Sequence, residues 1–153
     1  MLFHASIPAD NPERVARVIA EVWRGESLPF PPVPGCYTAF AGDDRGSVID
    51  VTPRGREGIP GATEVDFKLN PSPSPYSESH LLLGTPLSES EVLAIAKREG
   101  WTARVCSRGE SNKLIEFWVE NKFLLEFITA SDEKRYRENT SPASFRAAFG
   151  LTA

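Results

Sequence analysis

Two halves of this chain repeat the same order of expected elements, and this repeat constrains the fold more than any other feature. A Pro-rich run, Asn70-Pro71-Ser72-Pro73-Ser74-Pro75, lies near the middle of the 153 residues. It can form neither a helix nor a central strand, because alternate residues lack an amide hydrogen and have a fixed φ. On each side of it, the hydrophobic pattern predicts a strand, a helix and then several strands. Residues 70–76 are therefore interpreted as a stiff linker between two similar modules.

The first module is expected to span residues 1–69. A strand over residues 2–7 precedes a helix that Asn11 can cap and Pro12 can open. Apolar residues then recur at helical spacing, and Gly25 is expected to end the helix in a left-handed conformation. Further strands are predicted over residues 36–41, 47–52 and 62–69.

The second module is expected to span residues 77–130. A strand over 79–83 precedes a helix over 89–99, for which Ser88 and Glu91 provide a capping box. Three more strands are predicted, over residues 102–107, 113–120 and 123–129. Residues 131–153 are expected to form a C-terminal helical tail, with a helix after Ser141-Pro142. This mixed order predicts an α+β fold with helices outside a curved sheet.

Composition excludes several classes of protein. The formal charge is −4, from 17 basic and 21 acidic residues, which argues against a nucleic-acid partner or an anionic membrane. No apolar run approaches the roughly 20 residues that span a bilayer, and the first residues lack the pattern of a secretory signal. The two cysteines, Cys36 and Cys106, are expected to be buried thiols. A cytoplasmic location is expected.

Four residues that can carry chemistry occupy matching positions in the two halves. The two histidines, His4 and His80, stand in the opening strand of each module. Asp50 lies 46 residues after His4, and Glu126 lies 46 residues after His80. Both acids interrupt otherwise apolar strands. The equal spacing supports the internal repeat and predicts equivalent places for the two pairs.

Strand alternation predicts which way these four side chains point. Their neighbours on each strand are apolar, and residues adjacent in a strand point to opposite faces. If the apolar faces meet the helices, the imidazoles and carboxylates face the hollow between the sheets. Two imidazoles and two carboxylates form a good ligand set for a divalent first-row metal.

Short motifs in this order resemble a known superfamily. Leu2-Phe3-His4-Ala5-Ser6-Ile7-Pro8-Ala9-Asp10 followed by a helix resembles the opening of a glyoxalase/bleomycin-resistance/extradiol-dioxygenase protein, of the vicinal oxygen chelate superfamily. Ser79-His80-Leu81-Leu82 resembles the start of that superfamily's second module. Val48-Ile49-Asp50-Val51 and Phe123-Leu124-Leu125-Glu126-Phe127 resemble its carboxylate-bearing strands. The resemblance covers residues 1–130.

The resemblance implies paired βαβββ modules that form a half-open barrel around a divalent metal (Zn, Ni, Fe, Mn or Co). It carries metal ligation onto His4, Asp50, His80 and Glu126, with Glu126 also able to shuttle a proton as the catalytic residue. It implies an enzyme acting on a small oxygen-rich substrate, with isomerase or lyase chemistry favoured over ring-cleaving dioxygenation, and a homodimer. The alternative is a non-catalytic protein of the bleomycin-resistance type that binds or sequesters a small molecule.

Three departures from the superfamily pattern stand out. Asp50 replaces a usual glutamate, so water can bridge it to a metal. The run from Pro29 to Gly35 occupies the place of the first strand after the first helix. Glu120-Asn121-Lys122 replaces the usual Asp-Pro-Asp-Gly turn before the last strand.

Simpler interpretations stay open for several residues. The histidines can be ordinary polar strand residues, and Glu126 can pair with Arg104 or Lys113. Glu116 is a possible second carboxylate or general base, although a solvated edge position is expected for it. Arg54 and Arg56 can hold an anionic substrate, although solvated loop charges are the expected account.

Overall fold

The structure, a computed structural model, describes residues 2–108 and 112–151. Residue 1, residues 109–111 of the expected second module and residues 152–153 of the expected tail lie outside it. The first module comprises β1 (His4–Ala9), α1 (Pro12–Trp23), β2 (Glu26–Pro29), β3 (Tyr37–Phe40) and β4 (Val48–Pro53). The second comprises β7 (Leu81–Thr85), α2 (Glu89–Glu99), β8 (Thr102–Arg108), β9 (Asn112–Val119) and β10 (Phe123–Thr129).

The two modules have the same topology. Their four-stranded sheets have the orders β1-β4-β3-β2 and β7-β10-β9-β8. In each sheet the first strand pairs in parallel with the last, and the other neighbours are antiparallel. The prediction of an α+β fold with paired βαβββ modules is therefore confirmed. Among the described strands, the two sheets stay separate and do not close into a barrel.

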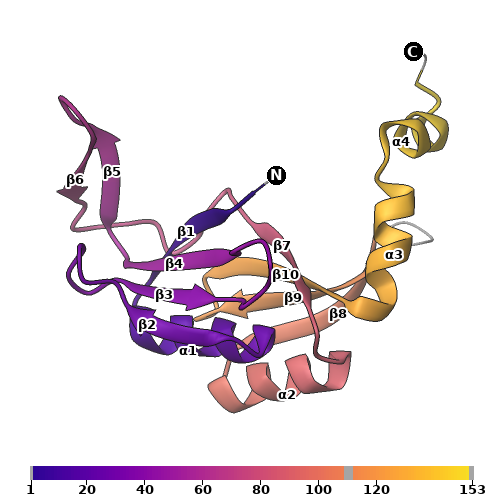
Figure 1. Ribbon diagram of the computed structural model, residues 1–153, viewed down its shortest axis with the longest axis horizontal. Coiled ribbons are helices and arrows are strands. Elements are labelled where there is room, and N and C mark those ends of the chain that lie inside the picture. Colours follow the sequence, from indigo (N-terminus) through magenta and orange to yellow (C-terminus); the bar gives the residue numbers. More distant parts are fainter. Residues whose placement is uncertain (1, 109–111, 152–153) are drawn as a thin grey trace.

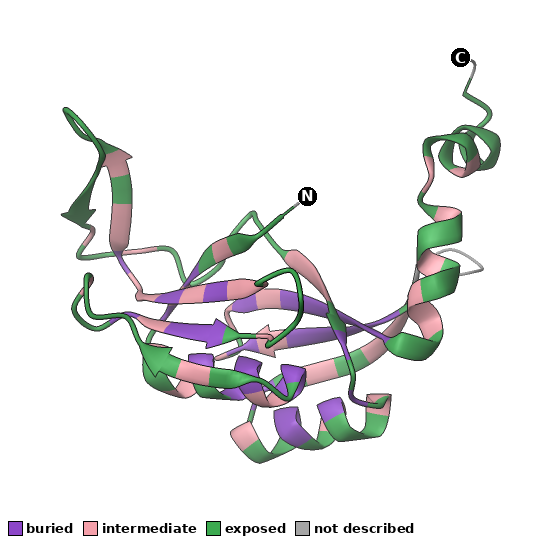
Figure 2. Ribbon diagram, viewed as in Figure 1, coloured by how far each residue is buried: buried purple, intermediate pink, exposed green. Residues whose placement is uncertain are grey.

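Helices α1 and α2 lie on the same side of the two sheets and leave the opposite side open (Figure 1). The strands and the inner sides of both helices carry the buried residues (Figure 2). One hydrophobic core joins the modules; its largest fully buried side chains include Ile7, Ile19, Val51, Val92, Phe117, Leu125 and Phe127. The apolar strand residues thus face the helices, which directs their neighbours in the sequence toward the open side.

The ends of the helices confirm two predicted caps and correct a third. The Asn11 side chain accepts a hydrogen bond from the Arg14 amide, and the Ser88–Glu91 capping box is present. The left-handed residue that ends α1 is Arg24, with φ 55°, so the prediction for Gly25 is wrong. Glycine is required at residue 25 for a steric reason instead, because a Cβ there would lie 1.8 Å from the Phe40 carbonyl oxygen.

The first module contains a strand that the sequence did not predict. Strand β2 occupies Glu26–Pro29, directly before the prolines, so the expected loss of the first strand after the helix is wrong. Pro29 is tolerated because β2 is an edge strand, which can lack a ladder donor. The predicted strand over residues 62–69 is shorter, and it pairs with a further strand. Together β5 (Arg56–Pro60) and β6 (Val65–Leu69) form a separate β5–β6 hairpin.

The C-terminal tail forms two helices rather than one. α3 (Ala130–Asn139) continues directly from β10, and α4 (Pro142–Phe149) follows Ser141, as expected. The Ser141 side chain caps α4 by accepting a hydrogen bond from the Ser144 amide. Neither helix has a buried residue. These helices form a C-terminal arm at one side of the open face, while the β5–β6 hairpin rises at the other (Figure 1). None of the described helices is long and apolar enough to cross a bilayer.

Polar contacts hold the two modules together within the chain. Glu120, in the turn between β9 and β10, accepts hydrogen bonds from the amides of Asp10 and Asn11, at 2.6 and 2.8 Å. At the other end of α1, Trp23 Nε1 donates to the Gly84 carbonyl at 3.1 Å. The carboxylate of one module therefore stabilises the N-terminus of the other module's helix.

Candidate metal centre and ligand cavity

The open side of the second module brings one predicted pair of residues together. Leu125 and Phe127 are buried in the core, so Glu126 between them points away from it. His80 immediately precedes β7, and its Nε2 lies 3.7 Å from Glu126 Oε2. The carboxylate side chain is 9% exposed, and the imidazole is 55% exposed. This pair is a nearly buried acid beside an accessible imidazole.

A second acid lies directly beside Glu126. Glu116 of β9 pairs with it across the strands, and both residues are buried. Arg104 of β8 binds Glu116 through Nε and Nη2, each 2.6 Å from Oε2. This contact raises the pKa of the Arg104 guanidinium. The expected solvated edge position of Glu116 is therefore wrong, because strand register places it on the same face as Glu126.

The matching place in the first module has different chemistry. Asp50 of β4 accepts a hydrogen bond from Thr38 Oγ1 at 2.7 Å, and these two residues are direct cross-strand partners. Thr38 thus holds the position that Glu116 holds in the second module. Asp50 also lines a cavity of about 830 Å³ between the first sheet and the β5–β6 hairpin. The repeat in topology is therefore not a repeat of one chemical site.

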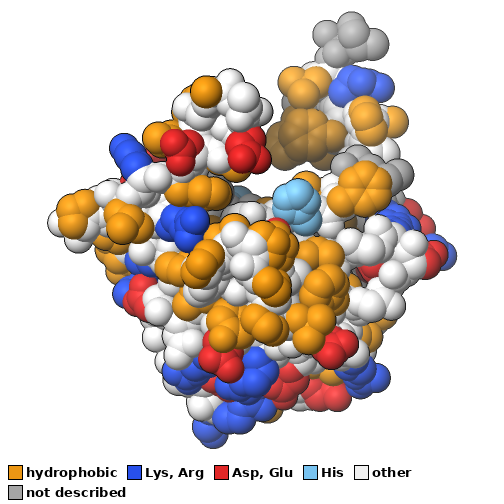
Figure 3. All heavy atoms as spheres, turned by 60° about the vertical axis from the view of Figure 1, so that its left-hand side comes forward, with side chains coloured by type: hydrophobic (Ala, Val, Ile, Leu, Met, Phe, Trp, Pro, Cys, Tyr) orange, Lys and Arg blue, Asp and Glu red, His pale blue; other side chains and the backbone are white. Residues whose placement is uncertain are grey.

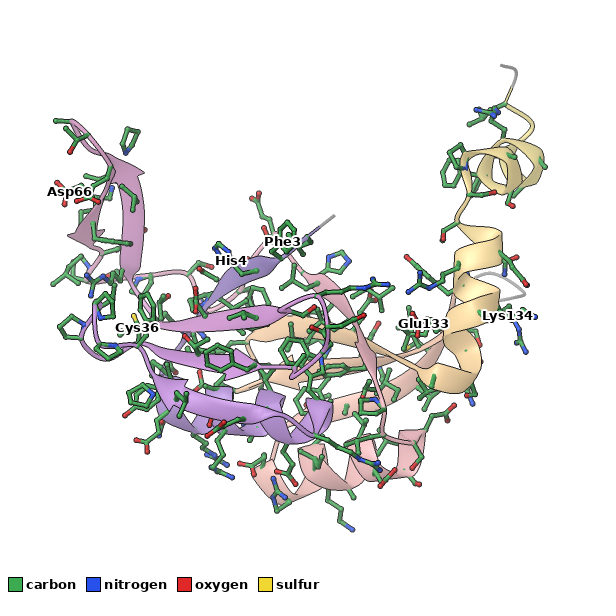
Figure 4. The ribbon with its side chains drawn as sticks, viewed as in Figure 1. Phe3, His4, Cys36, Asp66, Glu133 and Lys134 are labelled. Atoms are coloured by element: carbon green, nitrogen blue, oxygen red, sulfur yellow. The ribbon has the colours of Figure 1, made fainter. Side chains whose placement is uncertain are left out.

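His4 lies at the start of β1, beside Phe3, on the open side between the hairpin and the arm (Figure 4). It lines a groove of about 720 Å³ together with residues from both modules, including Leu82 and Leu83 of β7. Hydrophobic side chains gather over this part of the surface, and a histidine is visible among them (Figure 3). Phe3 is 58% exposed, so it does not join the apolar face that meets α1.

The four predicted ligands are thus unequally distributed. His80 and Glu126 lie together, Asp50 lies in the cavity of the first module, and His4 lies in the groove between the modules. Within residues 2–108 and 112–151, no three His, Cys, Asp or Glu side chains are grouped closely enough to hold a metal. The ligand set and the role of Glu126 stay predictions.

Two arginines of the first module are less solvated than expected. The Arg54 side chain is 10% exposed, and its Nε lies 2.6 Å from Asp10 Oδ1. Arg56 stacks over the Phe67 ring, with its guanidinium carbon 4.5 Å from the ring centre. Both line the 830 Å³ cavity. The sequence did not predict these contacts, because they join Arg54 to Asp10 and Arg56 to Phe67, residues that are distant in the chain.

Both cysteines are free thiols, as expected. Cys36 is buried, as expected, at the edge of the same cavity, whereas Cys106 is only partly buried, so the expected burial is wrong for Cys106. Burial raises the pKa of the Cys36 thiol. It is therefore protonated at neutral pH and is a poor nucleophile or metal ligand in that state.

Comparison with solved structures identifies the fold. FosX, a fosfomycin resistance protein of Listeria monocytogenes, in a structure with Mn(II) and sulfate, is 12% identical over 90% of this chain and 96% of its own, with a TM-score of 0.58. A glyoxalase family protein of Bacillus anthracis is 14% identical, with 84% and 93% covered and a TM-score of 0.55. FosX of Mesorhizobium loti is 12% identical, with 89% and 96% covered and a TM-score of 0.52.

No protein-family model matches the chain, and no curated protein matches its sequence. At such low identity, the likeness to solved structures shows the fold alone. That fold is the one that these FosX and glyoxalase family structures have, and it agrees with the fold that the resemblance of the short motifs implied.

Proposed function

We propose that this chain is a divalent-metal-dependent enzyme that acts on a small oxygen-rich substrate. The observation that carries the proposal is the His80–Glu126 pair, 3.7 Å apart on the open side of the second module. Two ligand atoms that are each about 2.1 Å from one ion can lie up to about 4.2 Å apart, so this pair fits a shared divalent ion. The Mn(II) in a FosX structure of the same fold supports a metal of this kind.

His4 is the proposed third ligand. Catalytic metal sites commonly use three protein ligands and leave a position for substrate or water. His4 and the His80–Glu126 pair stand on the same open side of two sheets that share one core. We propose that all three come from one chain, because polar contacts already fix its modules against each other. Asp50, engaged with Thr38, would contribute through water rather than directly.

The surrounding residues suggest how the reaction would proceed. When bound, a divalent ion supplies Lewis acidity toward neighbouring oxygens of the substrate. Glu126 would take up and release a proton at its carboxylate, and its side chain is largely shielded from water. Arg104 binds Glu116, the cross-strand neighbour of Glu126. Its positive charge offsets the charge of the Glu116 carboxylate beside Glu126. Isomerase or lyase chemistry is proposed ahead of ring-cleaving dioxygenation, for which two histidines and one carboxylate would bind iron.

Metal analysis tests the proposal. Protein purified without chelator and loaded with Mn(II), Zn(II), Ni(II), Co(II) or Fe(II) is expected to retain about one equivalent of one of these ions per chain. His80→Ala and Glu126→Gln are each expected to lower the affinity for that ion by at least about tenfold. Glu138→Gln, an exposed acid on the arm, is the matched control. Retention of less than about a tenth of an equivalent after loading would contradict the proposal.

A second candidate function is binding or sequestration of a small molecule without catalysis. The 830 Å³ cavity favours it, because Phe30, Val33, Phe67 and Tyr76 give the cavity an apolar lining. Tight binding of a hydrophobic small molecule, unchanged by chelator, would support this function over the metal enzyme. A homodimer is proposed for either function, by resemblance to the superfamily.

A further inference from the structure

We propose that the cavity under the β5–β6 hairpin binds a small monocarboxylate with an apolar body, and that Arg56 and Arg54 receive its carboxylate. This site lies in the first module, and its lining includes Asp50 but neither His80 nor Glu126. Binding there is expected without a bound metal. Its volume of about 830 Å³ is within the range of small-molecule sites.

Two buried donors point to the charge of the ligand. Among the described residues, Arg54 Nη2 and Arg56 Nε are the buried side-chain nitrogen or oxygen atoms without a hydrogen-bond acceptor. Both belong to side chains that line this one cavity. A buried donor without an acceptor costs free energy, and a buried charge costs more. An anion in the cavity would give both atoms an acceptor.

The arginines are already held in place. Arg54 is anchored by Asp10, at 2.6 Å, and its Nη2 lies 3.7 Å from Glu120 Oε2, which is beyond hydrogen-bond distance. Arg56 is fixed by stacking over Phe67. Little side-chain freedom would therefore be lost when a ligand binds, and such preorganisation raises affinity.

The base of the hairpin is rigid for a steric reason. The Asn70 amide donates to the Gly55 carbonyl at 2.7 Å, and its side chain donates to Glu57 at 2.7 Å. Gly55 has φ +88°, and a Cβ at this position would lie 2.6 Å from the Asn70 carbonyl oxygen. The contacts of Gly55 and Asn70 therefore fix the β5–β6 hairpin in its position over the cavity.

The other charges of the cavity favour a single negative charge on the ligand. Asp50, Glu57 and Glu64 also line it. Asp50 accepts a hydrogen bond from Thr38, and Glu57 pairs with Asn70 and Lys68, so neither of the two arginine nitrogens without an acceptor is served by these two acids. The acids that line the cavity would repel a phosphate dianion more strongly than a carboxylate, which carries a single negative charge. The apolar wall leaves room for an aromatic or branched body.

Phenylacetate and its neutral analogue phenylacetamide test the proposal by calorimetry in the presence of chelator. Phenylacetate is expected to bind at least about tenfold more tightly than the amide, because charge-assisted hydrogen bonds are stronger than neutral ones. Inorganic phosphate is expected to bind more weakly than phenylacetate. Equal affinity of acid and amide, or preference for phosphate, would overturn the proposal.

Two variants locate the binding. Arg56→Met keeps the length of the side chain and is expected to remove the preference for acid over amide. Phe67→Ser is expected to weaken both compounds, and phenylacetate more, because the ring also positions Arg56. Arg137→Met on the arm is expected to change neither. An unchanged preference in Arg56→Met, with binding to the amide retained as evidence of folding, would contradict the site.

The same titration in His80→Ala separates this proposal from the metal proposal. Phenylacetate binding is expected to survive His80→Ala, whether or not the protein binds metal. Binding that required metal and was lost in His80→Ala would place the anion at the His80–Glu126 pair and overturn the cavity site.

Discussion

At the scale of single residues, Gly25 is required because it has no side chain. The chain turns directly from α1 into β2 at this point and passes against the backbone of Phe40. The sequence also marked Gly25 as important, but because it was expected to end α1 in a left-handed conformation. In the structure Arg24 has that conformation. A local pattern identifies a turn, but it cannot show which distant strand approaches the turn.

Gly25→Ala is therefore expected to destabilise the protein by about 2 kcal/mol or more, because a backbone carbonyl must move to admit the methyl group. Urea denaturation measures the change. Gly84→Ala is the matched control, because a Cβ there meets no atom within 4 Å. Equal midpoints for the two alanine variants would contradict the steric role of Gly25.

At the scale of elements, the contact between α1 and α2 depends on a buried acid at the end of α2. Glu99 has a side chain that is 6% exposed, and it binds Arg14 of α1 at 2.7 Å and Arg98 at 2.8 Å. Burial raises the pKa of this carboxyl, but the hydrogen bonds from Arg14 and Arg98 outweigh burial and lower it below the usual value. The fold therefore favours the ionised form.

This lowered pKa predicts a pH dependence of stability. The contribution of Glu99 is present above the pKa of the unfolded chain, about 4.3, and is lost as the pH falls through the lower folded value. Glu99→Gln is expected to cost about 1–3 kcal/mol at pH 7. The difference between variant and wild type should shrink below pH 4 in urea denaturation.

Glu133→Gln provides the control for this prediction. Glu133 also binds an arginine, Arg137, but on the exposed surface of α3. Exposed pairs of this type contribute less than about 1 kcal/mol. A loss in Glu99→Gln no greater than in Glu133→Gln would show that the helix contact does not depend on the buried acid.

At the scale of the whole molecule, the arrangement of the modules decides where a metal site can form. The modules share one core, and α1 and α2 cover the same side of both sheets (Figure 1). His4 and the His80–Glu126 pair are thereby left on the common open side. A site within one chain is the arrangement that we propose, whereas modules exchanged between two copies would combine His4 of one copy with the pair of the other.

Mixing of variants distinguishes these arrangements. His4→Ala and Glu126→Gln, unfolded together and refolded as an equal mixture, are expected to bind no more metal than either alone. Exchange between copies would instead restore one intact site in each mixed dimer, or about a quarter of an equivalent per chain. Light scattering on the same samples measures whether the homodimer forms. Restored binding would contradict a site within one chain.

The sequence by itself determined most of the elements and the faces on which most of their side chains lie, because helix caps and the alternation of strands are local properties. The helix over residues 89–99, its capping box and the strand over 123–129 are as predicted, and the matched spacing of His4–Asp50 and His80–Glu126 indicated the repeated fold. The contacts between elements distant in the sequence were decided only by the tertiary structure. Strand register placed Glu116 beside Glu126, and packing between elements brought Arg54 to Asp10 and Arg56 to Phe67, because such contacts depend on how whole elements pack.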